Sequence, residues 1–137
     1  MVKIIVGNKG AGKTKKIIDM INKAVENETG SVVCIEKGMK LTYDISHRCR
    51  LVDAEEFGIS GYDMFFGFVS GLCAGNYDIS RVYIDGILKI GGRNYDALAA
   101  FFEKMEKLSE QAKAEFLFTV SADAEELPAS VTKYLLD

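Results

Sequence analysis

A glycine-rich segment close to the first residue constrains the fold of this chain more than any other feature. Residues 7–14 read GNKGAGKT and follow VKIIV, an apolar run at residues 2–6 that is typical of a strand buried on both faces. After the segment the spacing becomes helical, with apolar positions at Ile17, Ile18, Ile21, Ala24 and Val25. A helix that begins directly after a glycine loop presents free backbone N–H groups, which bind phosphate oxygens. The sequence therefore predicts a strand, a phosphate-binding loop and an amphipathic helix.

The residue types within the loop suit a polyphosphate bound together with a metal ion. The backbone N–H groups of residues 8–14 can turn inward around a phosphate only where no side chain obstructs them, which accounts for the glycines. Lys13 is expected to bring its ammonium group to the β- and γ-phosphates, and Thr14 is expected to offer its hydroxyl to Mg²⁺. The predicted nucleotide-binding residues of the loop are Gly7, Asn8, Lys9, Gly10, Ala11, Gly12, Lys13 and Thr14.

The rest of the chain alternates strand-like and helix-like segments. Further strands are expected at residues 31–36, 49–52, 81–85 and 115–120, and helices at 62–74, 94–113 and 129–136. Residues 86–92, which contain three glycines, are expected to form a loop. Because parallel strands need crossover connections, this alternation predicts an α/β fold: a three-layer α-β-α sandwich with a mainly parallel sheet of about five strands. Residues 1–137 are expected to form one domain, with ligands at the carboxyl edge of the sheet.

Charge and hydropathy exclude several classes of function. The net charge is -3, from 17 Lys and Arg against 20 Asp and Glu, and the two signs are interspersed, so nucleic acid binding is not indicated. No apolar signal core opens the chain, and no stretch approaches the roughly 18 apolar residues that suggest a membrane span. A cytoplasmic location is therefore expected. Three widely spaced cysteines and one histidine predict neither a disulfide framework nor a zinc site.

A second motif lies some tens of residues beyond the loop. Residues 82–85 read VYID, an apolar strand whose final carboxylate, Asp85, is expected to hold a water on Mg²⁺. Through GNKGAGKT and VYID the whole chain resembles the P-loop NTPase superfamily. That resemblance implies the P-loop NTPase fold, with Mg²⁺ and a nucleotide bound. The N-K-x-D motif by which GTPases read guanine is missing, which favours ATP.

One branch of the superfamily is favoured by the last expected strand. Residues 116–123 read FLFTVSAD, similar to the strand whose polar end senses the γ-phosphate in RecA-like ATPases, and this similarity assigns the sensor role to Thr119. A weaker resemblance extends to secretion and twitching-motility ATPases. In this branch another strand lies between the loop strand and the Asp strand. Residues 2–6 would then form an apolar sheet edge that needs cover from the terminal helix or from a partner chain.

The residues that would support hydrolysis are less well defined. Many motor ATPases carry a glutamate directly after the strand Asp, but Gly86 stands there in this chain. RecA-type recombinases carry a glutamate near the end of an earlier strand, and Glu36 matches that place; the alternative is a solvated glutamate at a strand end. Among four arginines, Arg93 is preferred for charge stabilisation, the alternative being a surface arginine without a role. The predicted catalytic residues are thus Lys13, Glu36 and Arg93.

Three functions remain open on these residues. The first is a slow or partner-stimulated ATPase, the second a nucleotide-dependent binding module without useful hydrolysis, and the third a small-molecule kinase. Self-association or binding of a protein partner is expected through the sheet edge and through the aromatic helix of residues 62–74. Packing of that helix into the core is the alternative.

Overall fold

The computed structural model describes residues 1–136, which form an α/β fold around one five-stranded sheet. The strands are β1 (Val2–Val6), β2 (Ser31–Glu36), β3 (Arg50–Asp53), β4 (Ile79–Asp85) and β5 (Glu115–Val120). All strand pairs are parallel, and the order across the sheet is β1-β5-β4-β2-β3. The predicted parallel sheet is confirmed.

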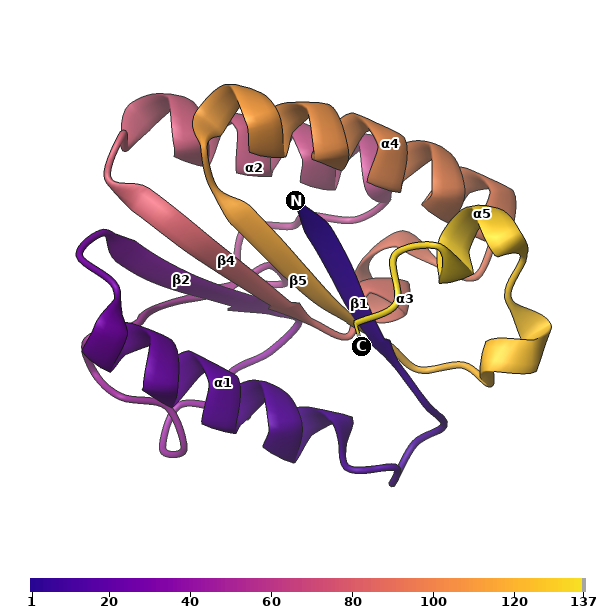
Figure 1. Ribbon diagram of the computed structural model, residues 1–137, viewed down its shortest axis with the longest axis horizontal. Helices are drawn as coiled ribbons and strands as arrows, with labels where there is room; N and C mark the ends of the chain where they lie inside the picture. The colour runs from indigo at the N-terminus through magenta and orange to yellow at the C-terminus, as the bar shows by residue number, and fades with distance from the viewer. Residues whose placement is uncertain (137) are drawn as a thin grey trace.

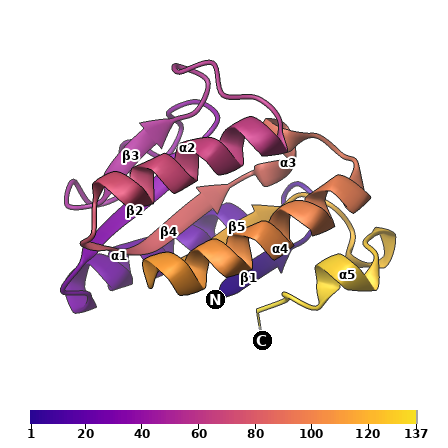
Figure 2. The ribbon, with the colours of Figure 1, turned by 90° about the horizontal axis from the view of Figure 1, so that it is seen from above.

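Helices cover both faces of this sheet. They are α1 (Lys13–Asn27), α2 (Tyr62–Gly75), α3 (Ile87–Gly91), α4 (Tyr95–Ala112) and α5 (Ala129–Thr132), with a 3₁₀ turn at Ala124–Glu126. Figure 1 shows α1 below the sheet and α2 and α4 above it, and Figure 2 shows α2 and α4 side by side over the same face. This arrangement is compatible with the expected three-layer sandwich.

Alternation along the strands divides the buried residues between two cores. In β2, Val33 and Ile35 face α2 and α4, whereas Val32 and Cys34 face α1. Strands β4 and β5 alternate in the same way, because successive side chains of a strand point to opposite faces. The larger core, on the side of α2 and α4, contains a cluster of tilted and edge-to-face aromatic rings formed by Tyr62, Phe65, Phe101, Phe102, Phe118 and Tyr134.

Strand β5 lies between β1 and β4, which is the position expected for the last strand. Residues Val2 to Val6 pair in register with Phe116 to Val120, and on the other side Ile84 of β4 pairs with Phe118. Strand β1 is consequently the last strand at its side of the sheet. The expected apolar edge is therefore present.

The end of the chain covers that edge, but not as a helix. The prediction of a helix over 129–136 is wrong beyond Thr132, where α5 ends. The chain then runs beside β1: the Ile4 N–H donates to the Tyr134 carbonyl at 2.9 Å, and the Leu136 N–H donates to the Ile4 carbonyl at 2.9 Å. The backbone of β1 could be satisfied in this way only by an extended segment, so the tertiary contact overrides the helical pattern.

The remaining differences from the sequence prediction concern boundaries and one short helix. Strand β3 is shifted by one residue from 49–52, β4 begins two residues before 81, and α4 is one residue shorter at each end than 94–113. The segment 86–92, expected to be a loop, contains α3. Three of its five residues, Ile87, Leu88 and Ile90, are buried, and their packing stabilises a helix that local propensity alone does not predict.

The aromatic helix is largely a core element. Phe65 of α2 is fully buried, and Phe66 and Phe68 are partly buried against the larger core, which supports the alternative of core packing. No helix within residues 1–136 is long and apolar enough to span a membrane. Association of the chain with a second copy or another protein stays a prediction.

Removal of the Tyr134 side chain tests the docking of the C-terminal segment. Tyr134 is buried, and its ring centroid lies 5.3 Å from that of Phe102. We expect Tyr134→Ala to lower the free energy of unfolding by about 3 kcal/mol in urea titrations, as loss of a buried aromatic ring does. The exposed neighbour Ser130 provides the control, since Ser130→Ala should change the value by less than about 0.5 kcal/mol. Equal stability of Tyr134→Ala and wild type would show that the segment does not pack there.

Candidate functional site

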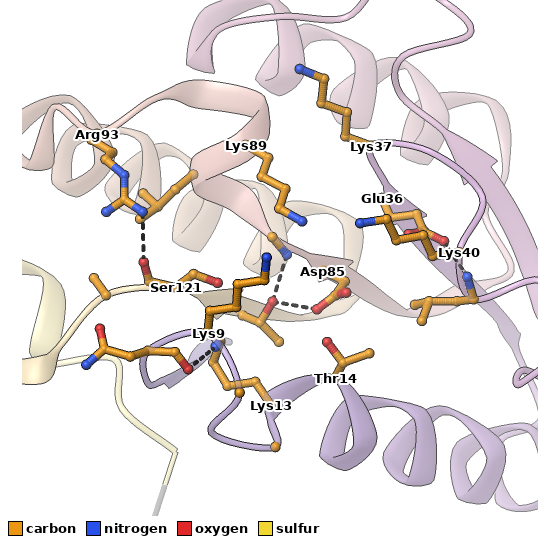
Figure 3. Close-up of a pocket in the computed structure, with 18 of the residues that line it drawn as sticks. Lys9, Lys13, Thr14, Glu36, Lys37, Lys40, Asp85, Lys89, Arg93 and Ser121 are labelled. Carbon is orange, nitrogen blue, oxygen red and sulfur yellow. Dashed lines mark hydrogen bonds between the residues drawn. The ribbon is translucent and has the colours of Figure 1, made fainter.

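An open cavity of about 960 Å³ lies at the carboxyl edge of the sheet. Its walls come from the glycine loop, from the ends of β2, β4 and β5, and from α3 with the segment after it (Figure 3). Most of the predicted site residues line it, namely Asn8, Lys9, Gly10, Gly12, Lys13, Thr14, Glu36, Asp85, Arg93 and Thr119. Gly7 and Ala11 belong to the loop but are not among the lining residues.

The glycines of the loop adopt conformations that other residues rarely take. Gly10 has a φ of 90° and Gly12 a φ of 87°, both in the left-handed region. At Gly7 a Cβ would lie only 2.9 Å from the Cβ of Ala11, so the tight path of the loop needs glycine there too. The loop therefore leads directly from β1 into the first turn of α1, where Lys13 begins the helix.

Lys13 is held inside the loop. Its Nζ donates a hydrogen bond to the Asn8 carbonyl at 3.1 Å, and the residue is buried. Burial lowers the pKa of Lys13, the carboxylate of Asp85 opposes that shift, and the nearby charge of Lys89 adds to it. An anion beside Lys13 would offset both the cost of burying its charge and the repulsion from Lys89, because it stabilises the charged ammonium.

The two predicted metal ligands face each other across the cavity. Figure 3 shows the Thr14 hydroxyl and the Asp85 carboxylate pointing toward one another. Within residues 1–136 no three His, Cys, Asp or Glu side chains converge to hold a metal ion on their own. Two protein oxygens nevertheless fit Mg²⁺, which usually keeps several waters and takes further oxygens from the phosphates of its substrate.

A hydrogen-bond chain fixes the Asp85 carboxylate. The Thr119 hydroxyl donates to Asp85 Oδ1 at 2.7 Å and accepts from the Gly86 N–H at 2.7 Å. Thr119 is only 1% exposed, so this chain is shielded from water on the Thr119 side. The Thr119 hydroxyl thus engages the end of β4, where it orients Asp85, and its expected role in sensing a γ-phosphate stays a prediction.

The strands bring three polar side chains to the same side of the sheet. Glu36, Asp85 and Thr119 each lie two residues beyond a residue of the α1-side core, and alternation puts them on that side as well. Glu36 is directly opposite Asp85 in the pairing of β2 with β4. The same side carries the glycine loop and Thr14, since both flank the start of α1. Strand register thus assembles the site.

Glu36 is buried, not solvated. It is 4% exposed, and its Oε2 accepts a hydrogen bond from the Leu41 N–H at 2.9 Å. Burial raises the pKa of Glu36, and the negative charge of Asp85 raises it further, while the backbone N–H groups of Leu41 and Lys40 oppose both. The alternative of a solvated strand-end glutamate is wrong. Glu36 lines the cavity and also holds the segment that follows β2.

Arg93 is the arginine that reaches the cavity. Its guanidinium donates to the Ser121 carbonyl at 3.2 Å and so connects the segment after α3 with the segment after β5. Arg81 forms an ion pair with Glu28 at the opposite end of its strand. Neither Arg48 nor Arg50 lines the cavity.

Three lysines of the cavity wall were not predicted. Lys37 and Lys40 follow Glu36, and Lys89 lies on α3 four residues after Asp85. The cations of the cavity are Lys9, Lys13, Lys37, Lys40, Lys89 and Arg93, against the carboxylates Glu36, Asp85 and Glu126. Across residues 1–136 none of these cations forms an ion pair. Proximity in sequence to Glu36 and Asp85 was the only signal that could have identified the three lysines.

No protein-family model matches the chain, and a search of curated proteins gives no match.

The raised pKa of Glu36 predicts a pH-dependent stability. A carboxyl whose pKa is raised by folding binds protons more tightly in the native state, so its contribution falls as the pH rises above 4.5, the ordinary value for glutamate. Glu36→Gln removes this titration and keeps an acceptor for Leu41. We expect the variant to gain stability relative to wild type between pH 4.5 and 7, measured by urea unfolding.

The exposed Glu103 on α4 gives the matched control for this experiment. Glu103→Gln should show no such trend with pH. A constant difference between Glu36→Gln and wild type across the range would contradict the raised pKa of Glu36.

Proposed function

We propose that this protein binds Mg-ATP in the cavity, and that its fold is a P-loop NTPase fold of the RecA-like branch. The observation that carries the proposal is the convergence of Lys13, Thr14 and Asp85 on one cavity, behind a loop whose glycines adopt left-handed conformations. Backbone N–H groups at the start of α1 add donors for phosphate oxygens. The excess of unpaired cations in a chain of net charge -3 supports a polyanionic ligand.

The strand order supports the choice of branch. Strand β5 lies between the loop strand β1 and the Asp strand β4, which is the arrangement expected for RecA-like ATPases. The polar end of β5, at Thr119, adjoins Asp85. In kinases and GTPases the loop strand and the Asp strand are neighbours, and here they are not.

Each residue has a defined role in the proposed complex. Lys13 would exchange the Asn8 carbonyl for phosphate oxygens, and Thr14 and Asp85 would hold Mg²⁺ together with phosphate and water oxygens. The metal ion, when bound, neutralises charge on the phosphates. Thr119 keeps the Asp85 carboxylate in place, because its hydroxyl donates to Oδ1.

Slow hydrolysis is the activity that these residues fit. Glu36 lies opposite Asp85 at the cavity and has a raised pKa, which suits a carboxylate that accepts a proton from an attacking water. Its Oε2 is engaged by the Leu41 N–H, and residue 86 offers no side chain. A site with one partly engaged carboxylate is expected to turn over slowly unless a partner rearranges it.

Those two features also favour a second candidate function. A module that binds ATP and presents a conformation to a partner needs the loop, Lys13, Thr14 and Asp85, but no group that activates water. The bond between Glu36 and Leu41 would then serve only to hold the segment after β2.

Nucleotide binding is tested by Lys13→Ala with calorimetry in the presence of Mg-ATP. Hydrogen bonds to charged groups contribute about 1.5–3 kcal/mol. Their loss should weaken binding by about 10- to 150-fold. Lys16→Ala removes an exposed lysine three residues along the same helix and should leave the affinity unchanged. If Lys13→Ala binds as tightly as wild type, or wild type binds no nucleotide, the proposal fails.

Hydrolysis is tested by steady-state phosphate release from Mg-ATP. We expect Glu36→Gln to lower kcat by about 100-fold, the usual contribution of a general base. The affinity for a non-hydrolysable ATP analogue should stay within about twofold, because Glu36 does not bind the phosphates in this account. Release that does not depend on Lys13, despite Mg-ATP binding, would exclude the ATPase and leave the binding module.

A further inference from the structure

Helix α3 presents a single lysine to the cavity. Of its residues Ile87 to Gly91, the side chains of Ile87, Leu88 and Ile90 are buried, while Lys89 is exposed. The helix starts immediately after Gly86 and therefore stands beside Asp85 at the end of β4. Lys89 is consequently the only charged residue of this short helix.

The helix is held firmly by its surroundings. The Gly61 N–H at the start of α2 donates to the Ile90 carbonyl at 2.8 Å, and the Tyr62 hydroxyl donates to the Gly92 carbonyl at 2.6 Å. A Cβ on Gly91 would lie 2.2 Å from the Tyr62 ring, so the two elements are in close contact. The backbone that carries Lys89 thus has little freedom to move away from the cavity.

The stem of Lys89 crosses Gly86. Gly86 has a φ of 78°, and a Cβ at this position would lie 3.5 Å from Cδ of Lys89 and 3.8 Å from its Cγ. The space beside residue 86 is therefore taken by the lysine stem. Figure 3 shows Lys89 extending from α3 into the cavity, toward Lys9 and Asp85.

The ammonium group of Lys89 shares the cavity with that of Lys13, and two like charges in one cavity repel each other. No carboxylate in residues 1–136 forms an ion pair with Lys89. Arg93, the other cation on this wall, donates to the Ser121 carbonyl. Lys13 approaches from the glycine loop and Lys89 from the end of β4, and an anion between them would satisfy both.

We propose that Lys89 contacts the terminal phosphate of a bound nucleoside triphosphate and makes the site selective for triphosphates over diphosphates. The inference rests on the proposed nucleotide binding and names a residue and a specificity that the loop motif does not supply. A diphosphate can engage the loop and Lys13 without reaching the wall that carries Lys89. The third phosphate of a triphosphate carries the negative charge with which Lys89 can pair.

The test compares affinities for a diphosphate and a triphosphate in variants of Lys89. Lys89→Met keeps most of the stem over Gly86 and removes the charge, and Lys89→Arg keeps the charge. The probes are Mg-ADP and the Mg²⁺ complex of an ATP analogue in which NH replaces the β–γ bridging oxygen. The affinity for each probe is measured by calorimetry. Lys89→Met should weaken binding of the analogue by about tenfold or more, the loss expected for one hydrogen bond to a charged group. Its affinity for Mg-ADP should change by less than about twofold.

A matched control removes an exposed lysine outside the cavity. Lys107 on α4 does not line the cavity, so Lys107→Met should leave the ratio of the two affinities unchanged. Lys89→Arg should retain most of the selectivity. Equal loss of both affinities in Lys89→Met, or no loss of either, overturns the role of Lys89 while nucleotide binding stands. Failure of wild type to bind either probe overturns both proposals.

Discussion

The insertion of β5 between β1 and β4 is the pairing on which the site depends. Ile5 of β1 is opposite Thr119, and Ile84 of β4 is opposite Phe118, so the loop strand and the Asp strand are two interstrand spacings apart. Two spacings of about 4.8 Å put β1 and β4 about 10 Å apart. Thr119 occupies the strand between them and fixes the Asp85 carboxylate with its hydroxyl. The order of the strands therefore sets both the separation of β1 from β4 and the orientation of the Asp85 carboxylate.

The parts of the fold that follow from local patterns could be predicted from the sequence. Strand β1, the glycine loop and α1 show their periods clearly, and the polar end of β5 indicated its place in the sheet. Helix α3 could not be predicted, because five residues are too short for a helical period and it starts after a glycine with positive φ. The extended segment after Thr132 was missed because its structure depends on hydrogen bonds to Ile4, far away in the sequence.

The same distinction applies to the site. The roles predicted for Lys13, Thr14 and Asp85 depend on short spacings in the sequence, and the structure brings the three residues to one cavity. Glu36 was found by analogy with a strand end, but its burial and its bond to Leu41 depend on the segment after β2. Lys37, Lys40 and Lys89 were missed because the direction of a lysine side chain depends on the element that carries it. Six cations in one cavity of an acidic chain are a property of the fold and not of the composition.

Binding and catalysis make different demands on this cavity. In the proposed complex the loop, Thr14 and Asp85 bind phosphate and metal, and Glu36 is the carboxylate proposed to activate water, because residue 86 is a glycine. A crystal structure with Mg²⁺ and a non-hydrolysable ATP analogue tests the central claim most directly. We predict that the phosphates lie within hydrogen-bonding distance of the N–H groups of residues 10–14, that Lys13 Nζ leaves the Asn8 carbonyl for them, and that Mg²⁺ sits between Thr14 and Asp85. A nucleotide bound away from the loop, with Lys13 still on Asn8, would contradict the account.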